Sequence, residues 1–411
     1  MIHSSAVPAV PSAAFVRDHG PRMVFDGNGR TLFTRLTEVR DLADDPFVML
    51  LRVVDAIDRA DVSRTRTLLA LAHTRTPTAS SVVPARWLEP FTAAVDVDAA
   101  LASGEPPATV TMTETASPTG HLDIDAYIAL QAAEPSPATG EGEPHQALVL
   151  ADIAGLGRLA ARSATRLAPT DRYAAAETLR LDMYRRLDAA PPDPSTGIAL
   201  AQAMWPLVRA HNPRAARRLA DHAVSVLGHT PETTVASAVL AEHGERSATT
   251  LELLEPLLRA EKGMSAVTAV YARLLHASAC RRRHRPGQAY ESLCRALEDG
   301  FAERIVRPFL EVPGAVTLLD QFIGRFGHFN EFADEIRKHP AADRSAAAPR
   351  LTGKEMSVLQ QLPSGLTADR IAADMGVSVN TVKTHLRGIY HKLGVGARAD
   401  AITRARTHGL I

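Results

Sequence analysis

Apolar residues recur at intervals of three and four along most of the chain, the spacing that places them on one face of an α-helix. Short breaks marked by Pro, Gly or Asn separate these stretches. The pattern predicts a mainly α fold. Between about residues 145 and 339 it predicts helices at 171–187, 197–210, 214–227, 232–243, 248–259, 266–282 and 288–297.

These helices are expected to form pairs. Candidate pairs begin near Thr196, Pro231 and Ser265, at a spacing of about 35 residues that is close to the period of tetratricopeptide arrays. Stacked pairs of this kind present a long concave surface that suits binding rather than catalysis. Because no strict repeat consensus is present, an irregular helical domain is the alternative.

The first 144 residues have the least regular pattern. Residues 26–29 read Asp-Gly-Asn-Gly between two short apolar runs at 23–25 and 31–33, which predicts a small hairpin around a tight turn. A helical pair is expected to follow at about 45–58 and 62–73. The sequence predicts no function for this part.

The last sixty or so residues contain a series of helix start and stop signals. Thr352 and Glu355 have the spacing of a capping box, with a first helix ending near Leu362. Thr367 is a cap for a second helix that ends at Gly376. Ser378 caps a third helix, which is expected to span 379–393.

The third of these helices is predicted to have two faces. At 3.6 residues per turn, an apolar stripe about 60° wide is opposed by a polar face. The stripe contains Val382, Leu386, Ile389 and Leu393; the polar face contains Asn380, Lys383, Thr384, Arg387 and His391. A short helix, a turn with Gly and a second helix with such a polar face predict a helix-turn-helix that binds DNA.

The blocks LTGKEMSVLQQL, GLTADRIAADMGVS, NTVKTHLRGIYHKLGV and ARADAITRARTHGLI resemble the LuxR-type DNA-binding domain. The resemblance implies that Lys383, Thr384 and Arg387 lie over base edges, and that Asn380, Thr381 and Lys392 lie near phosphates. It also implies a fourth helix, at about 398–408, which usually forms the dimer contact in this family. The helix offers Ala401, Ile402 and Ala405 as a small apolar contact, but dimerisation through it alone is expected to be marginal because Ala397 weakens its start. Ala397 departs from the family, which commonly has Ser or Asn there as a helix cap, at a cost of about 1 kcal/mol.

The helical region has a second family resemblance. Residues 305–310, IVRPFL, preceded by Ala-Leu-Glu at 296–298, are similar to the end of the repeat region in large MalT-like regulators, which have a nucleotide-binding domain upstream. The chain has no G-x-x-x-x-G-K-[ST] motif, whose amides would bind phosphates. We therefore expect a shortened relative without the ATPase domain, and no ATP binding.

Composition and charge fit this interpretation. Residues 350–411 contain 9 basic and 4 acidic side chains, a net charge of +5, while the rest of the chain carries −5. A basic module on a mildly acidic body suits a nucleic-acid reader. The sequence shows no signal peptide and no uncharged apolar run of about 18 residues, so we expect a cytoplasmic protein without a membrane partner.

The candidate chemistry is sparse. Cys280 and Cys294 are too few for a disulfide framework, and His276 and His284 nearby do not complete a convincing metal site. No Ser/His/Asp set or carboxylate pair has a spacing that indicates catalysis. The sequence predicts no catalytic residue, no metal, no cofactor and no enzymatic activity.

Together these observations predict a region 1–144, a helical repeat-like regulatory domain 145–339, a linker 340–349 and a DNA-binding domain 350–411. The expected function is sequence-specific transcriptional regulation. The expected partners are double-stranded DNA, a second copy of the chain, RNA polymerase, and an inducer or protein partner at the helical body. The alternatives are a signalling or enzymatic helical protein in which DNA binding is secondary, and an anti-regulator that acts by protein contact alone.

Overall fold

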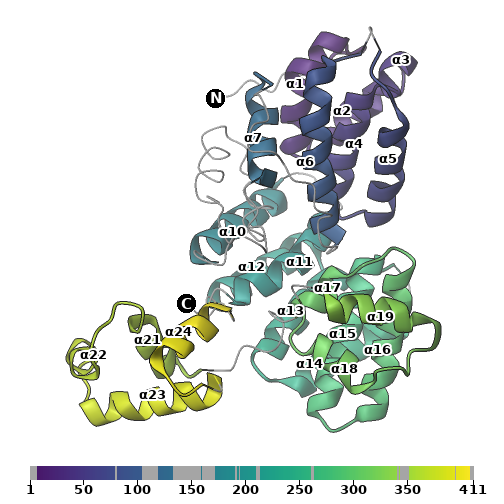
Figure 1. Ribbon diagram of the computed structural model, residues 1–411. Coiled ribbons are helices and arrows are strands. Elements are labelled where there is room, and N and C mark those ends of the chain that lie inside the picture. The colour runs from purple at the N-terminus through teal and green to yellow at the C-terminus, as the bar shows by residue number, and fades with distance from the viewer. Residues whose placement is uncertain are drawn as a thin grey trace.

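The computed structural model describes residues 7–78, 81–103, 119–132, 159, 172–189, 192–193, 195–209, 213–260, 263–339, 342, 351–393 and 395–407. Over these residues every regular element is a helix and no strand is present. The predicted mainly α fold is therefore confirmed. Figure 1 shows the helices in three groups along the chain.

The first group is a bundle built around a central helix. Its members are α1 (Ala13–Phe25), α2 (Gly29–Leu36), α3 (Arg40–Ala43), α4 (Pro46–Asp58), α5 (Val62–Thr74), α6 (Ala85–Ser103) and α7 (Leu122–Ala132). α4 packs against α1, α2, α5 and α6, and it is apolar on nearly every side, as a buried helix should be. Tyr127 stacks on Phe25 and meets Phe91 edge-on, which joins α7 to α1 and α6.

The hairpin predicted around residues 26–29 is wrong, whereas the helical pair 45–58 and 62–73 is confirmed as α4 and α5. Residues 26–29 end one helix and begin another. The amide of Asn28 donates to the carbonyl of Met23 at 2.7 Å and the amide of Gly27 donates to Val24 at 3.0 Å, with Gly27 at φ +82°. This is the Schellman pattern of a helix C-terminus. A tight turn is present at these residues, but the apolar residues on either side of it belong to helices and not to strands.

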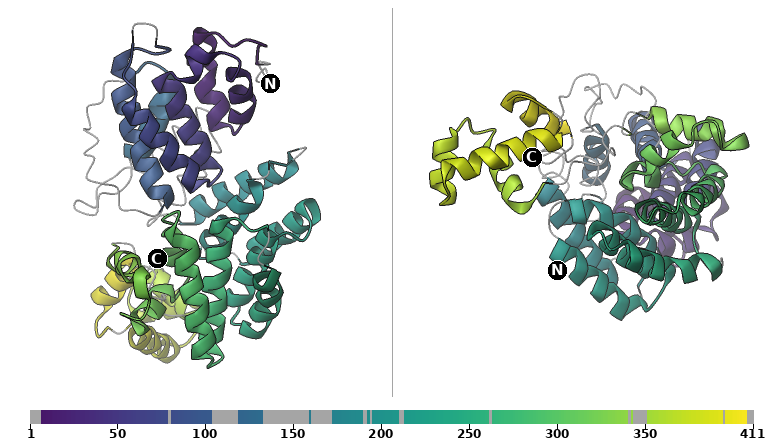
Figure 2. Two further views of the ribbon diagram at one scale, coloured as in Figure 1. Left: turned by 90° about the vertical axis from the view of Figure 1, so that its right-hand side faces the viewer. Right: turned by 90° about the horizontal axis from the view of Figure 1, so that it is seen from below.

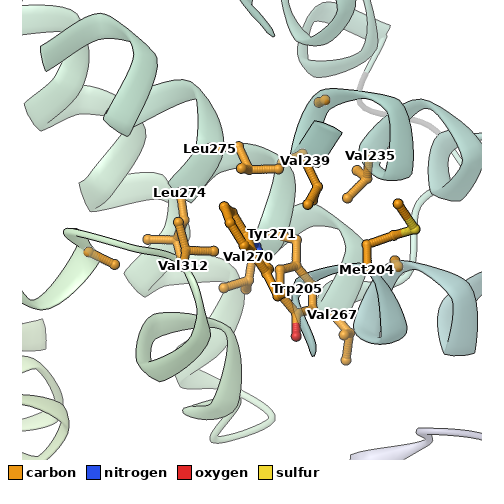
Figure 3. Packing of buried hydrophobic residues seen from close by; sticks show 14 of the residues in the cluster. Met204, Trp205, Val235, Val239, Val267, Val270, Tyr271, Leu274, Leu275 and Val312 are labelled. Atoms are coloured by element: carbon orange, nitrogen blue, oxygen red, sulfur yellow. The ribbon is translucent and has the colours of Figure 1, made fainter. Parts of the chain in front are cut away.

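The second group is a stack of helices that confirms those predicted between residues 171 and 297. It contains α10 (Arg172–Asp188), α11 (Thr196–Arg209), α12 (Pro213–Leu227), α13 (Pro231–His243), α14 (Ser247–Ala260), α15 (Ala266–Arg282) and α16 (Pro286–Phe301). Shorter elements complete it: α17 (Arg307–Glu311), α18 (Ala315–Gln321), η1 (Gly327–Phe329) and α19 (Asn330–Lys338). Figure 3 shows Trp205 of α11, Val239 of α13 and Leu274 of α15 converging on one apolar interior.

Corresponding helices of the stack repeat along the chain. The helices α11, α13 and α15 begin 35 residues apart, and each packs on the next as well as on the helix between them. Polar contacts follow a similar interval: Thr268 donates to Glu232 at 3.2 Å, and Ser278 donates to Glu242 at 2.9 Å, each pair 36 residues apart. The assignment to the tetratricopeptide type stays a prediction, because periodic packing alone does not define that family.

The third group consists of α21 (Gly353–Gln361), α22 (Ala368–Met375), α23 (Val379–Leu393) and α24 (Arg398–Thr407), which surround their own apolar core. Figures 1 and 2 show this group to one side of the stack. The predicted domain limits stay a prediction, because the boundary at 144/145 and nearly all of the linker 340–349 lie outside the described residues. Among the described helices, none is long and apolar enough to cross a membrane.

Candidate nucleic-acid interface

The helix starts predicted in the C-terminal group are present. Thr352 Oγ1 accepts the amide of Glu355 at 3.3 Å, and Glu355 Oε2 accepts the amide of Thr352 at 2.6 Å, so the capping box is complete. Thr367 caps α22, which ends at Gly376 with φ +65°. Ser378 Oγ accepts the amide of Thr381 at 3.1 Å and caps α23. These local bonds fix the short turn between α22 and α23.

The two faces predicted for α23 are also present. Val382, Ile389 and Leu393 are buried, and Leu386 is half-buried against the same core, where α23 packs on α21, α22 and α24. The opposite face is exposed. It presents Asn380, Lys383, Thr384, Arg387 and His391.

Four of the six predicted DNA-binding residues lie together on the exposed face: Asn380, Lys383, Thr384 and Arg387. The hydroxyl of Thr384 donates to the carbonyl of Asn380 at 2.9 Å, which leaves its methyl group and oxygen lone pairs to a ligand. Within the described residues, neither Lys383 nor Arg387 forms an ion pair with the protein. This surface therefore offers two cations to an anionic partner.

The side chains of the other two predicted residues contact other residues of the same domain. Thr381 is half-buried and its hydroxyl contacts Ser378 Oγ at 2.8 Å. Lys392 donates to Glu355 Oε2 at 2.6 Å, so it joins the end of α23 to the start of α21. Sequence reasoning missed this pair because the two residues are 37 positions apart. A phosphate contact by Lys392 stays a prediction.

Gly388 makes room for the Glu355–Lys392 pair. A Cβ atom at this position would lie 2.6 Å from Glu355 Oε1, closer than unbonded atoms approach. A glycine within a helix interior costs about 1 kcal/mol relative to alanine, so its presence usually has a packing reason. The glycine in the middle of the predicted third helix was the signal that could have indicated this close approach.

The carboxyl group of Glu355 responds to this environment. Burial alone would raise its pKa, but the Lys392 ammonium and the bonds to Thr352 outweigh burial and hold the pKa below its ordinary value of 4.5. A group whose pKa is lowered in the folded state stabilises that state above its unfolded pKa. The contribution is lost as the pH falls through the folded pKa.

We therefore expect the C-terminal group to lose stability in acid below about pH 4.5. The measurement is amide hydrogen exchange of residues 351–393 in the full chain at pH 7 and pH 3.5, corrected for intrinsic exchange. The variant Glu355→Gln, which does not titrate, serves as the control. An equal loss of protection in both proteins would assign the acid sensitivity to other groups.

The helix α24 has an anchor that the sequence did not reveal. Arg398 donates from Nη1 to the carbonyl of Leu366 at 2.6 Å and from Nη2 to that of Leu362 at 2.7 Å, beyond the C-terminal end of α21. The missing cap at Ala397 does not prevent the helix, whose first turn closes with Ala401 donating to the Ala397 carbonyl at 3.0 Å. The Arg398 contacts compensate for the weak start.

The apolar contact predicted on α24 is wrong for two of its three residues. Ala401 and Ala405 are fully buried in the core of their own domain, and Ile402 is half-buried against it. An apolar stripe on a short helix shows which side is buried but not against what. These alanines are therefore unavailable to a second copy of the chain.

Replacing Arg398 by Ala should release α24 from the domain. Two hydrogen bonds from a charged donor are lost, each worth about 1.5–3 kcal/mol at most, less for a half-buried side chain. We expect amides of 398–407 to exchange at least tenfold faster in the full chain, with α23 less affected. Arg370→Ala removes an exposed arginine that pairs only loosely with Asp374 at 3.6 Å, and it should leave α24 unchanged. Equal exchange in wild type and Arg398→Ala would mean that the Arg398 hydrogen bonds do not hold α24 against the domain.

A capped helix, a turn at a left-handed glycine, and a second helix with one buried and one cationic polar face define a helix-turn-helix domain. In agreement, residues 349–405 match the protein family described as "Bacterial regulatory proteins, luxR family". The C-terminal residues thus form a LuxR-type helix-turn-helix domain, as the sequence predicted.

Curated relatives are similar over the C-terminal region. The HTH-type transcriptional regulator MalT of Yersinia enterocolitica is 40% identical over 83 residues, and those of Serratia proteamaculans and Cronobacter sakazakii are 39% identical over 83 residues. Each match covers 20% of this chain and 9% of the relative's length. No solved structure matches the chain.

Proposed function

We propose that the chain is a sequence-specific DNA-binding transcriptional regulator that places residues 379–393, the helix α23, in the major groove. The observation that carries this proposal is the exposed face of α23, whose Lys383 and Arg387 form no ion pair with the described part of the chain, in a domain of the luxR family. A helix fits the major groove, where each base pair presents a distinct set of donors and acceptors. A cationic helix face is suited to that surface.

Each side chain of this face has a role in the proposal. Arg387 and Lys383 donate to guanine edges, and Thr384 offers its methyl group to a thymine methyl. Asn380 and Thr381, in the first turn of α23, lie near phosphates, where the amides of a helix N-terminus also favour anions. Lys392 lies near a phosphate at the far end of the helix, with its charge partly balanced by Glu355.

We propose further that the protein binds an inverted repeat as a homodimer. A single domain of this size has few base contacts, whereas two copies on half-sites one helical turn apart combine their specificity. Since Ala401 and Ala405 are buried, the helical body is the better candidate for pairing. The body would also bind an inducer or a protein partner, with RNA polymerase as a further contact, in the bacterial cytoplasm and without enzymatic activity.

The test is selection of bound fragments from random duplex DNA with the full chain, followed by footprinting. The expected result is one sequence motif with two related half-sites about 10 base pairs apart. The double variant Lys383→Ala, Arg387→Ala should recover no motif, while remaining folded by circular dichroism. Recovery of the same motif by the double variant would exclude α23 as the reader. Enrichment of no motif by the wild type would overturn the proposal.

A further inference from the structure

A cavity of about 220 Å³ lies where the N-terminal bundle meets the helical stack. Its wall includes residues of α4, α5 and α6 on one side and of α10, α11, α15 and α17 on the other. Two ion pairs join the same two groups: the buried pair of Arg186 with Asp58 at 3.2 Å, and the partly exposed pair of Arg59 with Asp193 at 2.9 Å. The cavity is therefore part of the contact between two halves of the body.

Most of the wall is apolar. The side chains that line it include Ile57, Val62, Leu69, Leu179, Met183, Val267 and Ile305, together with several alanines. A mostly apolar lining is typical of small-molecule sites. A cavity of 150 Å³ accommodates benzene, so this one has room for about nine non-hydrogen atoms.

Arg186, one of the residues that line this cavity, has an unsatisfied donor. Its side chain is 7% exposed; Nε donates to Asp182 at 2.6 Å and Nη2 donates to Asp58 at 3.2 Å. Its Nη1 is buried and, within the described part of the chain, has no hydrogen-bond partner. A buried donor without an acceptor costs free energy, which an acceptor in the cavity would recover.

The charges of the wall are balanced. Arg186 pairs with Asp58 and Asp182, Arg307 pairs with Glu311 at 2.6 Å, and Asp96 contacts His73 at 2.9 Å. A buried charge is costly unless it is paired, and these charged groups already have partners within the protein. A neutral ligand fits this balance better than an anion or a cation.

We propose that this cavity binds a small, neutral, mostly apolar molecule whose carbonyl or other acceptor takes a hydrogen bond from Arg186 Nη1. The bound molecule would act as an effector that changes DNA binding, a role that rests on the proposed function. Because the molecule contacts both the bundle and the stack, it would fix their relative position. The binding itself requires no DNA, so it can be tested separately.

The test uses the full chain, isothermal calorimetry and four probes of similar size. Acetophenone carries a neutral carbonyl; α-methylstyrene has the same shape without the acceptor; benzoate and benzylammonium are charged. We expect saturable binding of one acetophenone per chain, and at least tenfold weaker binding of the other three, because a hydrogen bond to a charged donor is strong. Absence of saturable acetophenone binding, equal binding of α-methylstyrene, or tighter binding of either ion would overturn the proposal.

Three variants locate the site. Ala199→Leu adds three carbons to a residue of the cavity wall and should abolish acetophenone binding, whereas Ala70→Leu, at an exposed position of α5, should leave it unchanged. Arg186→Lys keeps the charge and should remove the preference for acetophenone over α-methylstyrene. If Arg186→Lys does not fold, Ala199→Leu and Ala70→Leu still show whether acetophenone binds in this cavity. Unchanged binding in a folded Ala199→Leu protein would place the ligand elsewhere.

Discussion

Replacing Arg387 by Ala should weaken binding of the selected DNA motif by about 1–3 kcal/mol, which is about fivefold to 150-fold in Kd. Arg387 is exposed in the middle of the polar face of α23, one turn after Lys383 and Thr384. Its guanidinium can donate two parallel bonds to one guanine, so its loss should also relax the preference at one position of each half-site. Fluorescence anisotropy with the motif and with single-base variants measures both effects.

The matched control for Arg387→Ala is Arg217→Ala, which removes one exposed positive charge from α12 in the helical body. It should bind the motif like wild type, since it changes the net charge equally but lies on another helix. Equal weakening in the two variants, or an unchanged base preference in Arg387→Ala, would mean that Arg387 attracts DNA without reading it.

Replacing Glu355 by Ala should destabilise the helix-turn-helix domain by about 2–3 kcal/mol. The buried carboxylate caps α21 through Thr352 and holds Lys392 of α23, and the substitution removes both. A cap contributes about 1 kcal/mol, and a hydrogen bond with a charged partner about 1.5–3 kcal/mol. Hydrogen exchange of the slowest amides of 351–393 in the full chain gives the change in opening free energy.

Two further variants separate the contributions of Glu355. Glu355→Gln keeps an acceptor for the Thr352 amide and loses the charge, so it should cost less than Glu355→Ala. Asp369→Asn removes an exposed acidic residue from the first turn of α22 and should cost a few tenths of a kcal/mol through the helix dipole. If Glu355→Ala exchanges like wild type, the pair with Lys392 does not stabilise the domain.

The parts of the domain that the sequence predicted are those determined by local bonds. Thr352, Thr367 and Ser378 each bond to an amide three residues ahead, and Gly376 ends its helix by its own backbone conformation. Such signals lie within one turn of the chain, so a single sequence displays them. The face of α23 follows from helical periodicity in the same way.

Predictions failed where the outcome depends on distant residues. Periodicity identified Ala401 and Ala405 as one apolar face, but only the tertiary structure shows that they pack into their own core. The pairing of Arg186 with Asp58 joins positions 128 residues apart, and no local pattern specifies it. The sequence predicted a binding role for the helical body, yet it gave no reason to expect a cavity against α4 and α5.

The pairing of Lys392 with Glu355 affects how DNA binding by this domain depends on salt. Each phosphate neutralised by a protein cation releases counterions, and the logarithm of the binding constant falls with that of the salt concentration by about 0.9 per phosphate. The helix α23 contains Lys383, Arg387 and Lys392, but the charge of Lys392 is balanced by a carboxylate within the domain. The slope of the logarithm of the binding constant against the logarithm of the salt concentration should therefore be shallower, by up to about one unit per domain, than the number of cations on α23 suggests.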